Sequence, residues 1–324
     1  MKRILGVLGM VLVLYAALFS SHDQAGEVGN LIDVANYQGQ YGLITLGAAL
    51  VIITGGIDLS IGSVVACGAI LFSLLMTRGV HPYLAVPLVV LFGAGVGLAN
   101  GLLITRLRLQ PFLVTLCGMF VLRGVARLMG DTVSFSRVTQ AHPEFDGPLR
   151  SLRYYLIGKA HDSTLLFPGE FVLLVVLAVM LGFFLHRTAY GRYWYAIGHS
   201  ELAAKYAGVN VDRHRVVVYV ACSALAALTG VLLFLNSSSV QSDNAGLGWE
   251  LYAILGAVLG GCSLRGGEGT AVGMVLGAMV LPIIESIVNF RGEKSDVIPA
   301  VVGVTLLIGT VVDELIRRRS RVHR

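Results

Sequence analysis

Long apolar runs recur along this chain, and most are long enough to cross a membrane as a helix. Residues 84–105, 165–185 and 216–235 are three examples. About 20 apolar residues span the hydrocarbon layer as an α-helix, which satisfies its own backbone hydrogen bonds. The 324 residues are 56% hydrophobic and only 13% charged, too few charges for the surface of a soluble domain. The sequence therefore predicts an all-α polytopic membrane protein.

We expect about ten transmembrane helices, some of them broken or short, within a single transmembrane domain of residues 1–324. The expected spans are residues 4–19, 41–54, 61–77, 84–105, a fifth from Pro111, 165–185, 216–235, an eighth after Trp249, 272–288 and 297–316. The first run follows Lys2 and Arg3, so a cleaved signal peptide and a retained first span are both open. Residues 130–166 form the longest polar region, which we expect to be an extracytoplasmic loop.

A short glycine pattern occurs twice and indicates two related halves. The pattern Gly-Gly-x-x-Leu-x-x-Gly begins at Gly55 and again at Gly260, and small-residue helices follow both copies. Transporters are often built from such internal repeats. Only four positions match and three of them are glycine, so a chance match is the alternative.

One acid interrupts the apolar stretch between residues 41 and 77. Asp58 is the only charge there, and a charge in hydrocarbon is costly unless it faces protein or water. The glycines around it permit a break in the backbone, and Ser60 could cap the next helix. Two structures are open: a discontinuous helix lining a substrate route, or a tight turn with Asp58 as the N-terminal cap.

Polar groups in other spans extend this candidate pathway. Asn100 fits either a substrate contact or an interhelical hydrogen bond. Arg123 and Arg127 lie four residues apart, and both snorkelling to the interface and pairing with an acid are open for them. Trp249 and Tyr252 are expected to form an interfacial aromatic anchor. The candidate substrate-pathway residues are Asp58, Ser60, Asn100 and Glu250.

The longest polar and basic interruption in the second half is residues 187–215. Ser200 can cap a short helix, Glu201 suits its first turn, and Gly208 suits its end. An apolar stripe at i, i+4 and i+7 comprises Leu202, Tyr206 and Val209. Such a helix fits either a groove on another protein or the lipid headgroups.

The sequence GRYWYAIGHSELAAKYAGV in this interruption resembles the cytoplasmic coupling loop of ABC-importer permeases that serve sugars such as ribose, xylose and galactose. The matching string comprises Ala196, Ile197, Gly198, Ser200, Ala203, Ala204, Gly208 and Val209. GGIDLSIGS and RLRLQPFLVTLCGMFVLRG also resemble that family. The resemblance covers about residues 41–316 and is nearest to a permease of a galactofuranose importer.

This resemblance implies that residues 187–215 form a coupling loop fitting a cleft of a separate ATPase subunit. The residues implied to couple to the ATPase are Ser200, Glu201, Leu202, Ala203, Ala204, Tyr206, Gly208 and Val209. It also implies a periplasmic sugar-binding protein and a second permease copy or paralogue. ATP and Mg²⁺ would bind the partner ATPase, and this chain would bind no cofactor. Tyr252 replaces an aspartate typical of the family, which leaves the sugar open.

The sequence contains no motif for binding ATP or a metal ion. No glycine-rich phosphate loop is present, so any ATP that drives this protein binds another chain. The four cysteines lie in or beside apolar runs without metal-ligand spacing, and we expect buried structural thiols and no metal. The net charge of +5 is attributed to membrane-protein loops, so the expected partner is membrane lipid rather than nucleic acid.

Charge asymmetry tests the orientation. With ten spans and both termini in the cytoplasm, fifteen of the 24 Lys and Arg residues fall on the cytoplasmic side and seven outside. The remaining two are Arg123 and Arg127. This distribution satisfies the positive-inside rule and places residues 187–215 in the cytoplasm. The family resemblance implies that the chain lies in the inner membrane of a bacterium.

The sequence thus predicts a permease subunit of a bacterial ABC importer that moves a monosaccharide into the cytoplasm and is not itself an enzyme. The rival class is an ion- or proton-coupled secondary transporter with Asp58, Glu250 and Glu285 as ion sites. Within ABC importers, a branched-chain amino-acid permease is the nearest alternative.

Overall fold

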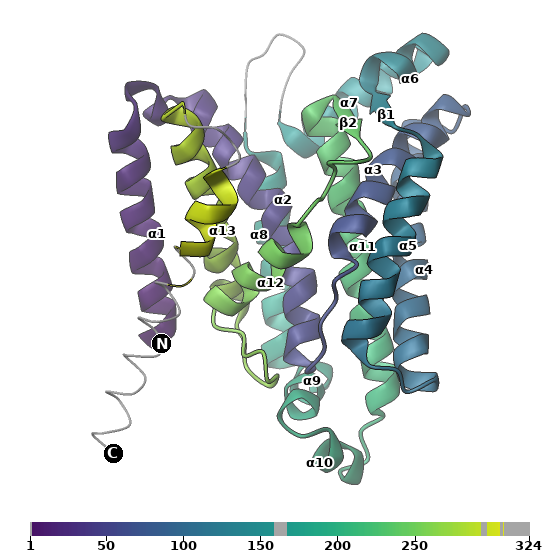
Figure 1. The fold of residues 1–324 in the computed structure, drawn as a ribbon, viewed down its shortest axis with the longest axis vertical. Helices are drawn as coiled ribbons and strands as arrows, with labels where there is room; N and C mark the ends of the chain where they lie inside the picture. Colours follow the sequence, from purple (N-terminus) through teal and green to yellow (C-terminus); the bar gives the residue numbers. More distant parts are fainter. Residues whose placement is uncertain (1, 159–166, 293–296, 305–306, 308–324) are drawn as a thin grey trace.

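The structure is a computed structural model that describes residues 2–158, 167–292, 297–304 and 307. It is a bundle of helices with one small two-stranded sheet (Figure 1). The elements are α1 (Lys2–Ser21), η1 (Asp23–Gly26), α2 (Val28–Ile53), α3 (Ile61–Thr77), α4 (Pro82–Arg106), α5 (Pro111–Met129), β1 (Thr132–Ser134), α6 (Phe135–Ala141), η2 (Pro143–Phe145), α7 (Asp146–Ile157), α8 (Gly169–Arg187), α9 (Ala189–His199), α10 (Glu201–Tyr206), α11 (Val211–Ser237), β2 (Ser239–Gln241), α12 (Trp249–Leu259) and α13 (Ala271–Phe290).

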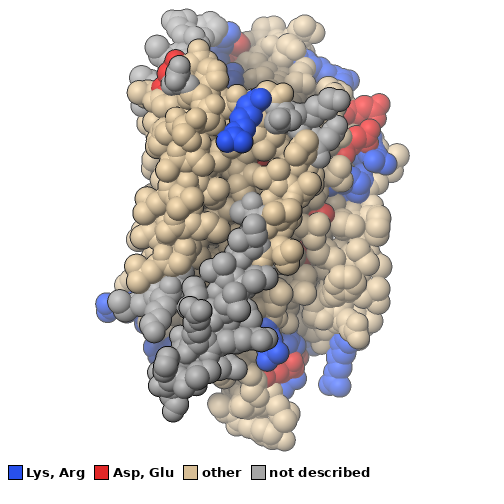
Figure 2. Space-filling view, turned by 60° about the vertical axis from the view of Figure 1, so that its left-hand side comes forward, with Lys and Arg blue, Asp and Glu red and all other residues tan. Residues whose placement is uncertain are grey.

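Within the described part of the chain, six helices are long and apolar enough to cross a membrane: α1, α4, α5, α8, α11 and α13. The helices α3 and α12 are apolar but shorter, with 17 and 11 residues. The protein is therefore an all-α, multi-pass membrane protein that includes short helices, as predicted. The tenth predicted span, residues 297–316, lies mostly outside the described residues, of which 298–304 are helical. Figure 2 shows a broad uncharged band on one face, with charged side chains gathered mainly towards the two ends.

Local signals explain where several helices begin. The helices α4 and α5 start with proline, whose fixed backbone angle suits the first helical position. Asn210 caps α11 by accepting a hydrogen bond from the Arg213 backbone N–H at 3.1 Å. Thr270 caps α13 in the same way through Gly273 at 3.2 Å. These caps satisfy backbone donors that the helix itself leaves unpaired.

The central helix is α11, which packs against α2, α3 and α4. Its contact with α4 depends on three glycines spaced four residues apart, Gly93, Gly97 and Gly101. A Cβ on any of them would press into the backbone of α11, for example into the Tyr219 carbonyl at Gly97. The small-residue stretch therefore lets the two helices approach closely, as the sequence predicts.

Residues 20–40 separate the first two expected spans, but α2 is already helical from Val28. In the first half of α2 the polar residues Asn36, Gln38 and Gln40 are buried and hydrogen-bonded. Asn36 donates to the Ile157 carbonyl at 2.9 Å and accepts from the Glu170 backbone N–H at 3.1 Å. Gln40 donates to the Glu170 carboxylate at 2.9 Å. These partners, more than 100 residues away, make a polar helix half compatible with the interior.

Residues 130–158 are also more regular than the predicted irregular loop. They contain β1, α6, η2 and α7, which lie at the end of the bundle opposite α10 (Figure 1). β1 pairs antiparallel with β2, with Val133 opposite Val240. The rest of the predicted loop, residues 159–166, lies outside the described residues.

Candidate functional site

A short helix forms where the sequence predicts one inside residues 187–215. It is α10, and Ser200 caps it by accepting a hydrogen bond from the Ala203 backbone N–H at 3.2 Å. Gly208 follows with a positive φ of 81°, a conformation that glycine adopts without strain. Both the predicted N-cap and the predicted stop are therefore confirmed as local structure.

Most of α10 projects away from the bundle, at the lower end in Figure 1. Leu202 is 63% exposed and Tyr206 is 85% exposed, whereas Val209 is half-buried. Ala203 is exposed, but Ala204 is only 3% exposed. The outward face thus carries two large apolar side chains, which favours contact with another molecule, while Ala204 packs against the protein itself.

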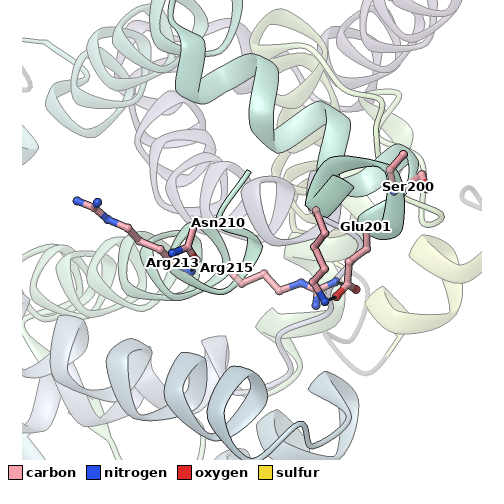
Figure 3. Close-up of polar contacts among 7 residues, drawn as sticks. Ser200, Glu201, Asn210, Arg213 and Arg215 are labelled. Carbon is pink, nitrogen blue, oxygen red and sulfur yellow. Dashed lines mark hydrogen bonds and ion pairs between the residues drawn. The ribbon is translucent and has the colours of Figure 1, made fainter. Parts of the chain in front are cut away.

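Glu201 forms two ion pairs, one within α10 and one that joins α10 to α11 (Figure 3). Its carboxylate accepts from Lys205 Nζ at 2.6 Å, one turn along α10, and from Arg215 Nη2 at 2.7 Å, on α11. The hydrogen bond from Lys205, supplemented by Arg215, lowers the pKa of Glu201 below its usual value. At neutral pH the carboxylate is therefore charged and ties the short helix to α11.

A second helix in this region, α9, was not predicted. Trp194 and Ile197 are buried on its inner side, and the Trp194 ring N–H donates to His214 Nδ1 of α11 at 3.2 Å. Thr188 caps its start through Gly191 at 3.2 Å. The spacing of Trp194 and Ile197 at i and i+3 is a helical signal that could have identified α9 from the sequence. The helix anchors residues 187–215 to the membrane-spanning part.

Asp58 lies in an extended segment, residues 56–60, that joins the end of α2 to α3. Its Oδ1 accepts from the Ser60 backbone N–H at 2.8 Å and from the Ser60 hydroxyl at 2.6 Å. Ser60 makes no side-chain cap for α3, and Asp58 is not its N-cap residue. The helical path is therefore broken over residues 54–60, and Asp58 is not the N-cap of α3. The expected capping by Ser60 is wrong, because its hydroxyl donates to Asp58 and accepts from Asn100 instead.

Asn100 and Glu250 come close to this segment from two other helices. Asn100 on α4 donates to the Ser60 hydroxyl at 3.1 Å, so it makes an interhelical hydrogen bond. A Cβ on Gly62, in the first turn of α3, would overlap Glu250 Oε2. The structure thus links Asp58, Ser60 and Asn100 directly and places Glu250 beside the start of α3.

These acids retain acceptor capacity. Asp58 is 2% exposed and Glu250 is 8% exposed. Within the described residues, neither Asp58 Oδ2 nor Glu250 Oε2 has a conventional hydrogen-bond partner, although the Cys222 thiol lies beside Asp58. Buried polar atoms normally have partners, so these oxygens are candidate acceptors for a polar substrate. Because both groups are buried, neither oxygen is open to solvent in this structure.

Arg123 has a role that neither prediction included. Its guanidinium donates to the carbonyls of Ala245 at 2.5 Å, Gly246 at 3.4 Å and Ser242 at 3.5 Å. It thereby holds the chain between β2 and α12. Arg127 does pair with an acid, since it contacts Asp243 at 2.7 Å in an exposed ion pair.

Other expected groups are placed differently. Trp249 packs against Tyr41 with ring centroids 4.8 Å apart, and α12 begins about half-way along the bundle in Figure 1, so Trp249 and Tyr252 do not form an interfacial anchor. Glu285 accepts a hydrogen bond from the Tyr41 hydroxyl at 3.1 Å. Cys117 is exposed, contrary to the expectation of four buried thiols, because α5 presents much of its surface outward.

Comparison with known proteins places this chain among transport permeases. Residues 30–310 match a family described as branched-chain amino acid transport system / permease component. The ribose import permease protein RbsC of Bacillus subtilis is 35% identical over 284 residues, covering 88% of this chain and 84% of the relative. RbsC of Escherichia coli K12 is 31% identical, covering 94% and 91%.

A third relative is the fructose import permease protein FruG of Bifidobacterium longum, which is 32% identical over 311 residues. The alignment covers 95% of this chain and 88% of the length of FruG. No solved structure matches the chain. The family match spans most of the sequence, and these relatives align over nearly their whole lengths. The chain therefore belongs to the family of ABC-transporter permease components that includes the ribose and fructose import permeases.

Proposed function

We propose that this chain is the membrane-spanning subunit of a bacterial ABC importer that moves a monosaccharide into the cytoplasm while a separate subunit hydrolyses ATP. The observation that carries the proposal is α10, an ion-paired helix that presents Leu202 and Tyr206 outward in a chain whose relatives are named as sugar import permeases. An exposed apolar face on a short anchored helix suits docking into a protein cleft.

The proposed assembly follows from that role. The ATPase, with ATP and Mg²⁺, docks at α10, and the residues from Ser200 to Val209 form the contact. The chain lies in the inner membrane with α10 and both termini in the cytoplasm. The start of α1 lies at the same end of the bundle as α10 (Figure 1), which supports a shared side. A periplasmic sugar-binding protein delivers ligand at the opposite end, and a second permease completes the pathway.

The proposed substrate contacts are the acceptor oxygens of Asp58 and Glu250, with Ser60 and Asn100 holding the extended segment. Sugars present several hydroxyl donors, and buried carboxylates bind such donors strongly. The particular sugar stays open: the sequence resemblance is nearest to a galactofuranose importer, and relatives are named as ribose and fructose import permeases.

The test is mass spectrometry of proteins that co-purify with the tagged chain from its native membrane in mild detergent. We expect an ATPase subunit in a stable ratio to the permease, and we expect its loss when Leu202 and Tyr206 are both changed to serine. The exposed apolar pair Leu91 and Val179, changed in the same way, serves as the matched control. Purification without any ATPase, repeated across detergents, would contradict the proposal.

A further inference from the structure

Three separate pieces of backbone meet at the end of α9. A Cβ on Gly198 would overlap both the Ile53 carbonyl oxygen, at the end of α2, and the Gly267 backbone nitrogen. Gly267 itself donates a hydrogen bond to the Ile53 carbonyl at 2.9 Å. A Cβ on Gly266 would lie 3.1 Å from Gly55 Cα. The two glycine turns that the sequence pattern singled out therefore contact each other and the last turn of α9, which leads into α10.

A second connection runs along α11. Arg215, Tyr219 and Cys222 are spaced i, i+4 and i+7 and so share one helical face. Arg215 binds Glu201 of α10 at 2.7 Å. One turn later the Tyr219 hydroxyl donates to the Ile57 carbonyl at 3.1 Å, and Cys222 lies beside Asp58. One face of α11 thus contacts α10 at one end and the extended segment at the other.

Both connections consist of close contacts with little free space. Gly198 leaves no room for even one methyl group, and a Cβ on Gly56 would lie 2.7 Å from the Tyr219 hydroxyl. Tyr219 is 1% exposed. Packed interiors compress little and transmit displacement to their neighbours. A displacement of α9 and α10 must therefore move the extended segment or break one of these contacts.

We propose that Gly198 and Tyr219 are positioning residues that transmit movement of α10 to the extended segment carrying Asp58 and Ser60. This rests on the proposed function, because the movement originates in the ATPase docked at α10. Gly198 acts on the turn at the start of the segment, and Tyr219 holds the segment through the Ile57 carbonyl. Closure of the ATPase thereby changes the exposure of the candidate substrate groups.

The test measures exposure of the extended segment in the full complex purified from native membranes. Leu59→Cys places a thiol on a half-buried position in the segment, and Cys117→Ser removes the exposed native thiol. The labelling rate with a water-soluble maleimide is measured without nucleotide and with ATP plus vanadate. We expect nucleotide to change the rate in this background and to have no effect after Tyr219→Phe or Gly198→Ala.

In Tyr219→Phe we expect the labelling rate without nucleotide and the association with the ATPase to equal those of the Leu59→Cys, Cys117→Ser parent. A purely structural role for Tyr219 would change these two readouts as well as the response to nucleotide. Matched controls that keep the nucleotide response are Tyr83→Phe, at an exposed tyrosine, and Gly95→Ala, at a glycine with open space around it. If Gly198→Ala does not fold, Tyr219→Phe decides alone, since it removes only the hydroxyl.

The outcomes separate the two proposals. A wild-type complex without an ATPase overturns the proposed function and this inference with it. If the complex contains the ATPase but Tyr219→Phe keeps the same nucleotide response, the inference alone is overturned. The inference is also overturned if nucleotide does not change the labelling rate in the Leu59→Cys, Cys117→Ser parent complex.

Discussion

Two adjacent alanines in α10 have opposite environments. Ala203 is exposed and Ala204 is buried, although both belong to the string that resembles coupling loops. The sequence suggests Ala204 as the place for a bulky charge that leaves the permease folded. The structure makes Ala203 the suitable position instead, because a charge at Ala204 would be buried without a partner and would destabilise the fold.

We expect Ala203→Glu to leave the thermal unfolding temperature of the purified chain within about 2 °C and to abolish ATPase association, since a surface substitution seldom changes stability by more than about 0.5 kcal/mol. Ala204→Glu should lower that temperature clearly. Thermal unfolding and co-purification are measured for both variants. Equal unfolding temperatures of the two variants would contradict the buried position of Ala204.

The Glu201 ion pairs predict a pH dependence. Their partners lower the pKa of the folded carboxyl, so the stabilisation is fully present above the unfolded pKa of about 4.3 and is lost as pH falls through the lower folded value. A spin label at Ala203→Cys should keep the same mobility from pH 8 to about pH 5 and become more mobile below about pH 4. The same label with Glu201→Gln should show high mobility throughout; a pH step that survives this substitution would assign the effect to another group.

At the scale of elements, the pairing of α4 with α11 depends on glycines. Gly97→Leu would force the helices apart, and we expect a loss of roughly 3 kcal/mol or more in the free energy of unfolding. Gly95→Leu, two residues away and facing open space, should change it little. Denaturant unfolding in detergent measures both; comparable losses would argue against close contact at Gly97 specifically.

The loop between β2 and α12 gives a second element-scale prediction. Arg123→Met removes a donor from three loop carbonyls. The Gly246 carbonyl keeps a hydrogen bond from the Trp249 N–H, and each buried carbonyl left unpaired costs about 1–3 kcal/mol. We expect faster hydrogen exchange of residues 242–248 and a lower unfolding temperature. Arg127→Met breaks only an exposed ion pair with Asp243, worth about 0–1 kcal/mol, and serves as the control. Unchanged exchange in Arg123→Met would contradict the role given to the guanidinium.

Elements with local signals could be predicted from the sequence. Ser200 and Gly208 delimit α10 through capping chemistry that needs no distant partner, and apolar runs identify the long helices. The helical start of α2 could not be predicted, because Asn36 and Gln40 become acceptable in the interior only through Ile157 and Glu170. The contact of Gly198 with the end of α2 and the hydrogen bond from Tyr219 to the Ile57 carbonyl were also out of reach, since they depend on tertiary packing.

At the scale of the whole molecule, the structure links two regions that the sequence treats separately. The helix α10 lies at one end of the bundle (Figure 1), and the Asp58 segment lies inside it. The face of α11 that carries Arg215 and Tyr219 connects them. An importer driven by ATP needs such a connection, whereas a gradient-driven transporter needs no exposed docking helix.

The most direct test of the proposed function is uptake of radiolabelled sugar into proteoliposomes that contain the purified complex and its binding protein. We predict uptake that requires ATP on the α10 side, persists when ionophores collapse all ion gradients, and is lost in Ala203→Glu. Uptake by the permease chain alone that proceeds without ATP and stops with an ionophore would contradict the account and identify a gradient-driven transporter.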